Sequence, residues 1–394
     1  MFRDYTPKIQ LIMIKKRLKS ITYIFLLFWI PNLQAITIDP YLPDASTPPV
    51  IAGKSLVWND EFNVDGKPNT ANWKSETGFV RNQELQYYQL ANANCINGVL
   101  VLNAKRDTVG NPNYNSGSSD WRYSRQNAFW TSGSIISQGK QSFLYGQFEI
   151  RARIDTTLGS WPAIWTKGIS GSWPNCGETD IMEFYIKSGA KTILANVAWG
   201  SATAPAVGTW NTKTKSLSYF LAKDADWCQK FHVWKEIWNK DSLKLFLDDE
   251  LLNTQLLTNT NNATGIIPAN PHQQAHFFLL NLAIGANGGT PRLTTSNFKY
   301  EVDYIRVYQN NITENQNILD KQIKIYPNPV IDFLNVQSQV QPQQIKITDI
   351  LGNTTKILQF SEEKLSLSQL KSGVYMLEIL LVDGSVYKQP ILKK

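Results

Sequence analysis

The chain has 394 residues, which is enough for two or three domains with sizeable cores. Its formal charge of +7 comes mostly from residues 1–35, which hold six basic residues and one acidic residue. Residues 36–310 hold 24 basic and 23 acidic residues, and residues 311–394 hold nine and eight. Because the chain beyond residue 35 is nearly neutral, nothing in it calls for a nucleic-acid partner or a strongly anionic ligand.

The first 35 residues have the organisation of a secretory signal peptide. A basic stretch, an apolar stretch and a small-residue cleavage site follow one another at residues 15–19, 21–30 and 33–35. The alternative is a membrane-anchoring helix, but a span needs about 20 apolar residues and this apolar run is shorter. We therefore expect removal of residues 1–35 and export of the rest. Met1 and Met13 both remain candidate start residues.

Short segments that alternate between apolar and polar residues occupy the chain from residue 55 to residue 309. The clearest are residues 56–62, 98–104, 144–154, 193–199, 231–238, 243–248, 277–284 and 302–308. Alternation with a period of two is typical of half-buried strands, and no long segment has the helical period of 3.6. We expect an all-β domain over residues 55–309, built as an antiparallel β-sandwich. A Pro-rich, polar linker at residues 36–54 precedes it.

A short apolar stretch near the middle of the chain holds three carboxylates. On a strand, Glu178 and Asp180 point to the same face, whereas Glu183 points to the opposite face. One extra residue in a β-bulge at residues 181–182 would return Glu183 to the common face, and we predict that bulge. Two carboxyl groups that flank a glycosidic bond can hydrolyse it. The alternatives are the acidic edge of an ordinary strand and a calcium site.

The three cysteines are an odd number for an exported chain. They are Cys95, Cys176 and Cys228, and their spacing is not that of a metal site. One disulfide with a free thiol and three buried thiols are both compatible with this sequence.

The motif Glu-x-Asp-x-x-Glu at Glu178, Asp180 and Glu183, with several segments between residues 56 and 308, resembles glycoside hydrolase family 16. The resemblance implies a concanavalin A-like jelly roll and a retaining endo-glycosidase without a catalytic cofactor. In that mechanism Glu178 is the nucleophile, Glu183 is the general acid/base and Asp180 supports both. The two glutamate carboxyls are then about 5–5.5 Å apart.

The substrate that the resemblance implies is a β-1,3-glucan or a mixed-linked β-1,3-1,4-glucan. Three alternatives stay open. The first is another polysaccharide such as a red-algal galactan, although the near-neutral charge weighs against sulfated galactans. The second is a transglycosylase, which uses the same intermediate. The third is a non-catalytic glucan-binding protein on the same fold, although all three carboxylates are present.

The resemblance also implies which residues bind the substrate. Asn82 matches a residue that hydrogen-bonds the sugar, and Trp161 and Trp165 match two tryptophans of the cleft. We also expect Trp199 to bind substrate. It stands with Ala198 where many family members have a histidine, and this departure leaves the substrate open. The alternatives are a loop asparagine that bonds its own backbone and tryptophans that belong to the core.

Family members often hold a structural calcium far from the cleft. By position its ligands would be Glu61, the backbone carbonyl of Gly98, and Asp303. Oxygen ligands of this kind suit a hard cation. The alternative is that the two carboxylates are solvated or paired with basic residues.

The C-terminal part of the chain is expected to be a separate unit. Residues 310–322 are Asn-rich and read as a linker, and residues 323–394 form a small β-sandwich that resembles the sorting domain of type IX secretion cargo. The alternative is a small carbohydrate-binding or fibronectin-like module. We expect a monomer, secreted or held at the cell surface, whose partners are the polysaccharide and the secretion machinery.

Overall fold

The computed structural model describes residues 38–311, 323–339, 341–349, 354–359, 364–382 and 386–394. The predicted signal peptide and almost all of the predicted linker at residues 310–322 lie outside this described part. Among the described residues, no helix has both the length and the apolar character that a membrane crossing requires.

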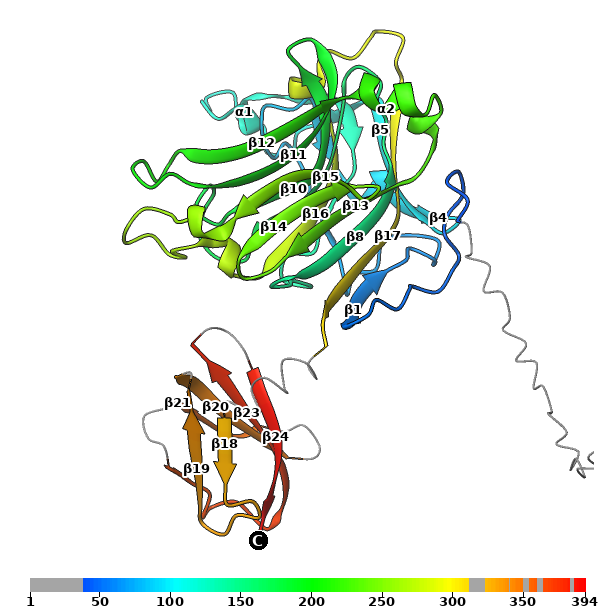
Figure 1. Ribbon diagram of the computed structural model, residues 1–394. Coiled ribbons are helices and arrows are strands. Elements are labelled where there is room, and N and C mark those ends of the chain that lie inside the picture. Colours follow the sequence, from blue (N-terminus) through cyan, green and yellow to red (C-terminus); the bar gives the residue numbers. More distant parts are fainter. Residues whose placement is uncertain (1–37, 312–322, 340, 350–353, 360–363, 383–385) are drawn as a thin grey trace, which may run out of the picture. The chain divides into compact units, whose positions relative to one another are not determined.

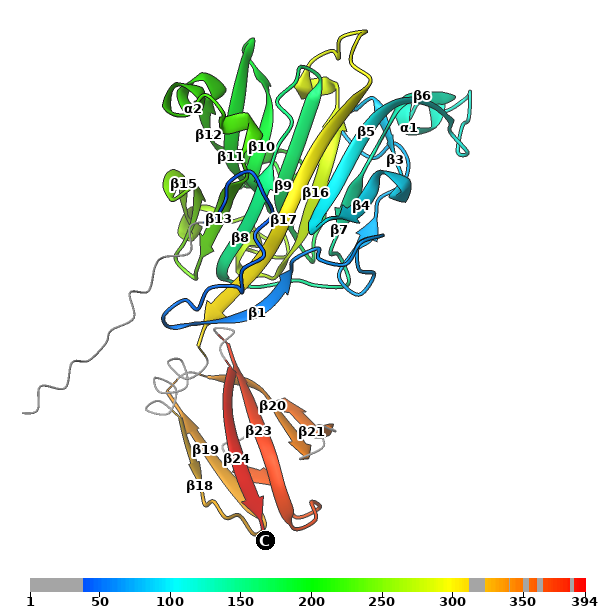
Figure 2. The same cartoon turned by 90° about the vertical axis from the view of Figure 1, so that its right-hand side faces the viewer.

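The larger unit is a sandwich of two sheets (Figures 1 and 2). Its first sheet has the strand order β15-β14-β13-β8-β17-β5-β6-β3, with β1 added beside β17 and β4 beside β5. These strands are β1 (Lys54–Asp60), β3 (Gln86–Tyr88), β4 (Ala93–Ile96), β5 (Val99–Gly110), β6 (Asn127–Ser132), β8 (Gly146–Arg153), β13 (His232–Trp238), β14 (Ser242–Leu247), β15 (Glu250–Leu256) and β17 (Asn297–Asn310). We call this sheet A.

The second sheet, sheet B, has the order β12-β11-β10-β9-β16-β7-β2. Its strands are β2 (Lys74–Ser75), β7 (Ser134–Ile136), β9 (Ser160–Gly168), β10 (Glu178–Lys187), β11 (Ala190–Gly200), β12 (Gly208–Ser216) and β16 (His276–Ile284). The paired strands of both sheets run antiparallel, apart from the parallel pair β3 and β6. The predicted all-β antiparallel sandwich is confirmed. The α-helices of the described part are short, α1 (Trp121–Ser124) and α2 (Leu217–Lys223).

The core lies between the two sheets and is built from alternate side chains of each strand. On β8, Phe148 and Ile150 are buried in the core, and Arg151 points away from it. Cys95, Cys176 and Cys228 form no disulfide, which excludes the alternative of one disulfide with a free thiol. Cys95 and Cys176 are buried, as the other alternative expects, but Cys228 is only partly buried.

One core position holds a carboxylic acid. Glu236 of β13 is fully buried, its cross-strand neighbours are Phe148 and Leu245, and neither of its carboxyl oxygens has a hydrogen-bond partner. Burial disfavours the charged form and raises the pKa of Glu236 to about 8. The fold therefore holds Glu236 in its neutral form at and below neutral pH.

The C-terminal unit has its own two small sheets and its own core. Its strands are β18 (Ile323–Tyr326), β19 (Phe333–Ser338), β20 (Pro342–Asp349), β21 (Thr354–Gln359), β22 (Lys364–Ser366), β23 (Gly373–Leu381) and β24 (Val386–Lys393). The sheets have the orders β18-β19-β22 and β21-β20-β23-β24. Between them Ile345, Ile347, Leu377 and Ile379 are fully buried. This is the small β-sandwich that the sequence predicts.

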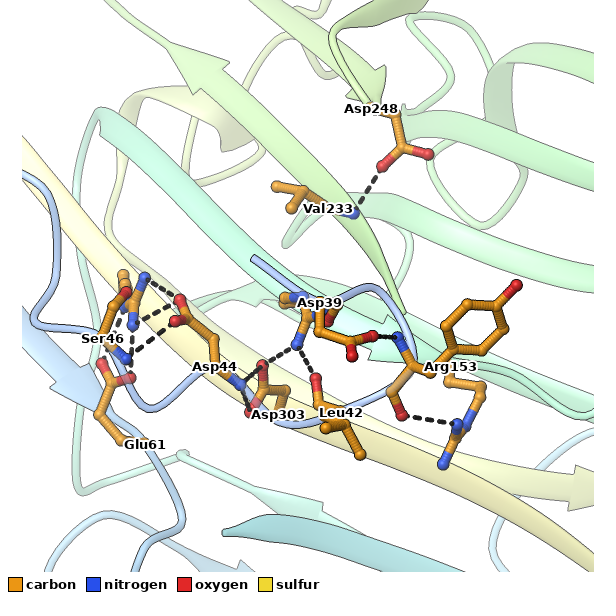
Figure 3. A network of polar contacts seen from close by, with 12 residues as sticks. Asp39, Leu42, Asp44, Ser46, Glu61, Arg153, Val233, Asp248 and Asp303 are labelled. Carbon is orange, nitrogen blue, oxygen red and sulfur yellow. Dashed lines mark hydrogen bonds and ion pairs between the residues drawn. The ribbon is translucent and has the colours of Figure 1, made fainter. Parts of the chain in front are cut away.

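Residues 39–46, which we expected to be part of a linker, lie across the outer face of sheet A (Figure 3). The Arg151 guanidinium donates to the carbonyls of Asp39 (2.7 Å) and Leu42 (2.9 Å). The amide of Phe231 donates to the carbonyl of Pro40 at 2.7 Å. These contacts attach the segment to β8 and to the residue before β13.

A buried ion network continues from this segment (Figure 3). Arg306 of β17 donates to both carboxylate oxygens of Glu61, at 2.9 and 2.7 Å, and lies 3.4 Å from a carboxylate oxygen of Asp44. Asp303 accepts from Arg151 and from the amide of Asp44. The side chain of Arg306 is 1% exposed, so removal of its charge would leave the buried carboxylate of Asp44 and the partly buried carboxylate of Glu61 without this cation.

We expect Arg306→Met to lower the free energy of unfolding by about 3–5 kcal/mol, because it breaks a buried ion network. Urea denaturation of the full chain measures this loss. Arg122→Met, which breaks the exposed pair with Asp120, is the control and should cost less than about 1 kcal/mol. EDTA should leave the melting temperature of the wild type unchanged. A large fall with EDTA would show that a metal ion stabilises this region instead.

The Glu236 carboxyl should make stability dependent on pH. Its pKa is higher in the folded chain than in the unfolded chain, so its stabilising contribution is present at acidic pH and is lost as the pH rises through 8. Glu236→Leu should therefore raise the melting temperature more at pH 9 than at pH 5, by roughly 5 °C or more at the higher pH. Equal melting-temperature differences at the two pH values would contradict this assignment.

Candidate active site

The carboxylates of β10 reach one face because the strand contains a bulge. The pairing register shifts between Asp180 and Glu183 against β11, and between Asp180 and Met182 against β9. Ile181 and Met182 are both fully buried in the core, so the strand resumes its alternation with Glu183 on the same face as Glu178 and Asp180. The predicted bulge is confirmed.

That face of sheet B forms a cleft of about 710 Å³. Residues from β9, β10, β11, β12 and β16 and from the three connections before β3, before β10 and after β16 line it: Arg81, Asn82, Glu84, Trp161, Ala163, Trp165, Lys167, Trp173, Glu178, Asp180, Glu183, Tyr185, Asn196, Trp210, Thr212, Asn281, Ala286 and Asn287. Aromatic faces combined with carboxyl and amide groups are what a sugar chain needs for stacking and hydrogen bonding.

Each glutamate carboxyl of the cleft accepts a hydrogen bond from a different tryptophan. The indole N–H of Trp173 donates to Glu178 at 2.8 Å, and that of Trp161 donates to Glu183 at 3.0 Å. The indole rings therefore fix the orientation of the two carboxyl groups.

The side-chain amide of Asn196 bonds two carboxyls of the motif at once. It donates to Asp180 at 3.0 Å and to Glu183 at 2.8 Å. Asn196 lies on β11 directly opposite Asp180.

The three carboxyls differ in the pKa that their surroundings impose. Burial and the charges of Glu183 and Glu178 raise the pKa of Asp180 well above its usual range. Burial also raises the pKa of Glu183 to about 7; the hydrogen bond from Trp161 opposes this rise and the charge of Glu178 adds to it. Burial raises the pKa of Glu178, against hydrogen bonds with Asp180 and Trp173 and the positive charge of Lys167. The site can therefore hold a protonated and an ionised carboxyl together.

Three of the four predicted substrate-binding residues line the cleft. Asn82 has a left-handed backbone with φ of 56° and donates to Glu84 at 3.3 Å. Trp161 and Trp165 lie on the cleft face of β9. Trp199, which we predicted to bind substrate, lies in the core between the sheets instead. Trp199 lies in the core because side chains alternate between the two faces of a strand. It is an odd number of positions from Asn196, which faces the cleft, so Trp199 points to the opposite face.

Several cleft residues were not named as site residues from the sequence. They are Arg81, Glu84, Lys167, Trp173, Tyr185, Asn196, Trp210, Thr212 and Asn281. Lys167 could have been found from the sequence, because it is an even number of positions from Trp161 and Trp165 on the same strand and so shares their face. Asn196 and Trp210 needed the pairing of β11 with β10 and β12, which is not a local property of the sequence.

The predicted calcium ligands lie away from the cleft. Glu61 and Asp303 belong to the ion network of sheet A, and Gly98 borders Asn63 and Pro43. The carboxylates already accept from arginines, and calcium requires six to eight oxygen ligands. No group of three or more acidic, His or Cys side chains in the described part is arranged to hold a metal. The residues as arranged do not fit calcium and favour the ion-pair alternative.

Comparison with known proteins gives two family matches. A family model described as glycosyl hydrolases family 16 matches residues 70–306. A second model, described as a secretion system C-terminal sorting domain, matches residues 324–393. The sorting domain marks the chain for export to the cell surface or the medium.

Among curated proteins, glucan endo-1,3-beta-glucosidase A1 of Niallia circulans is 30% identical over 285 residues, which is 67% of this chain and 39% of that protein. Beta-glucanase of Rhodothermus marinus is 30% identical over 275 residues, 64% of this chain and 85% of that protein. A solved structure reported with the endo-acting O-glycanases of the human gut microbiota is 29% identical, with a TM-score of 0.61. It covers 68% of this chain and 96% of its own.

The match over residues 70–306 spans more than half of the chain, including the bulged strand and most of the cleft. This chain therefore belongs to glycosyl hydrolases family 16 and is a glycoside hydrolase with a C-terminal secretion sorting domain.

Proposed function

We propose that this enzyme hydrolyses internal bonds of β-1,3-glucan or mixed-linked β-1,3-1,4-glucan with retention of anomeric configuration. The observation that carries the proposal is the bulged β10, which brings Glu178, Asp180 and Glu183 to one aromatic cleft. Retention needs two carboxyls beside one glycosidic bond, one as the nucleophile at the anomeric carbon and one as the acid at the leaving oxygen.

The proposed reaction has two displacements. In the first, a carboxylate oxygen of Glu178 bonds to the anomeric carbon while the bond to the leaving oxygen breaks, and Glu183 gives that oxygen its proton. In the second, water attacks the same carbon, Glu183 takes a proton from the water, and the bond to Glu178 breaks. The raised pKa of Glu183, about 7, supports its role as the proton carrier.

Asp180 and Asn196 support these steps without reacting. The protonated form of Asp180, favoured by burial and by its two neighbours, can donate to the carboxylate of Glu178. Asn196 holds Asp180 and Glu183 in position through one amide group. Ionisation of one carboxyl therefore shifts the pKa of the other two.

The names of the relatives support a glucan substrate, because the matches in Niallia and Rhodothermus are both glucanases. The structure with the TM-score of 0.61 favours a second candidate, an endo-acting O-glycanase that cuts the glycans of mucin. Both candidates use the same two carboxyls. We further propose that the export machinery recognises the C-terminal sorting domain.

The substrate prediction is tested with laminarin, lichenan, agarose, carrageenan and mucin glycans in parallel. We expect reducing ends from laminarin or lichenan, and proton NMR should show the β-anomer as the first product. Glu178→Gln should lower activity by roughly 10⁴-fold or more, while Asp120→Asn on the surface should not change it. Release from mucin glycans alone would favour the second candidate, and an inverted first anomer would exclude the double displacement.

The raised pKa of Glu183 predicts the alkaline limb of the pH profile. Glu183 must carry a proton in the first step, so kcat/KM should fall as the pH rises above about 7. Glu183→Gln should lower activity on polysaccharide by about 10²–10⁴-fold and spare an aryl glycoside whose leaving group needs no proton. Formation of the glycosyl-enzyme from that aryl glycoside by the variant should no longer show the alkaline limb. If the alkaline limb persists in Glu183→Gln, a group other than Glu183 carries the proton.

A further inference from the structure

The strand pairing places a lysine directly opposite the proposed nucleophile. Lys167 of β9 is the register partner of Glu178 of β10. The side chains of directly opposed residues on one face start about 4.5–5.5 Å apart. Both residues line the cleft, so both side chains lie on the same face of sheet B.

The ammonium group of Lys167 has no hydrogen bond or ion pair with any other described residue. The second cation of the cleft, Arg81, differs because its guanidinium is paired with Glu76. The positive charge of Lys167 is therefore not neutralised by direct contact with a carboxylate. It acts on Glu178 across the strand pair and through space.

We propose that Lys167 is a positioning residue that keeps Glu178 ionised for attack and so decides which of the two glutamates is the nucleophile. The inference rests on the proposed retaining function. It assigns to Lys167 an electrostatic role in the reaction that is exerted through Glu178.

The charges around Glu178 support this task. The charged or titratable groups that face it are Asp180 and Glu183 from β10, Lys167 from β9, Arg81 from the loop before β3, and Cys176 from the turn before β10. Its partner on β11 is Ala198, and the cleft residues of β12 are Trp210 and Thr212, none of which is charged. The two cations favour the ionised form of Glu178, and neither is among the main influences on Glu183.

The other task for a free cation in a sugar cleft is recognition of an anionic substituent. A sulfate or carboxylate bound to Lys167 would lie close to the ionised carboxylate of Glu178, its partner across the strand pair, and would be repelled by it. The arrangement therefore favours action on Glu178 over recognition of an anionic sugar.

The test compares Lys167→Met, the second neutral variant Lys167→Gln, and the charge-conserving variant Lys167→Arg, each in the full chain. Loss of the Lys167 charge should raise the pKa of Glu178. The acidic limb of kcat/KM should therefore move up by about 0.5–1 pH unit in both neutral variants. Lys167→Arg should restore the wild-type limb. Lys191→Met, an exposed lysine on neighbouring β11, should leave the limb unchanged.

A second readout needs no substrate. NMR titration of the chain labelled with ¹³C at glutamate carboxyls, with Glu178 assigned by its loss in Glu178→Gln, should show the same upward shift in Lys167→Met. If the wild type cuts no β-glucan, the proposed function fails while this titration still tests Lys167. An unchanged Glu178 titration overturns the inference. An unchanged acidic limb with weaker binding of an anionic glycan overturns it in favour of substrate recognition.

Discussion

The active site depends on one extra residue in one strand. In a regular strand Glu183 would point into the core, where an ionisable group without partners is costly. In the bulged strand two consecutive apolar side chains, Ile181 and Met182, are buried instead, and Glu183 turns to the cleft. Burial of these two side chains and the hydrogen bonds that Trp161 and Asn196 donate to the Glu183 carboxyl both favour the bulge. The same local packing that stabilises the strand therefore brings together the carboxyls of the proposed catalytic motif.

The two sheets have different tasks. Sheet B carries the proposed active site on its free face, where indole and amide groups hold three carboxyls with raised pKa values. Sheet A carries a buried network of arginines and carboxylates and the segment at residues 39–46. Buried ion pairs contribute little net stability compared with apolar packing, but they are specific in geometry. In this fold their geometry fixes the N-terminal segment to β8 and β17.

Neighbouring charges and hydrogen bonds distinguish the two glutamates of the cleft from each other. Glu178 and Glu183 have the same side chain and lie on one strand, so only their neighbours can give them different roles. Trp173, Lys167 and Arg81 act on Glu178, whereas Trp161 and Asn196 act on Glu183. Because Asp180 interacts with both glutamates, the three carboxyls titrate as a unit.

The strands, the sandwich and the three carboxyls on a bulged strand could all be predicted from the amino-acid sequence. The strands and the sandwich follow from the alternation of apolar and polar residues with a period of two. The bulge follows from the interruption of that alternation between Asp180 and Glu183. Three features became visible only in the folded chain: Trp199 lies in the core, Asn196 bonds two carboxyls, and Lys167 lies opposite Glu178. Alternation says that neighbours on a strand face opposite ways. Which of the two faces is the cleft depends on the pairing register with strands distant in the sequence, and that register is set by packing of the whole sandwich.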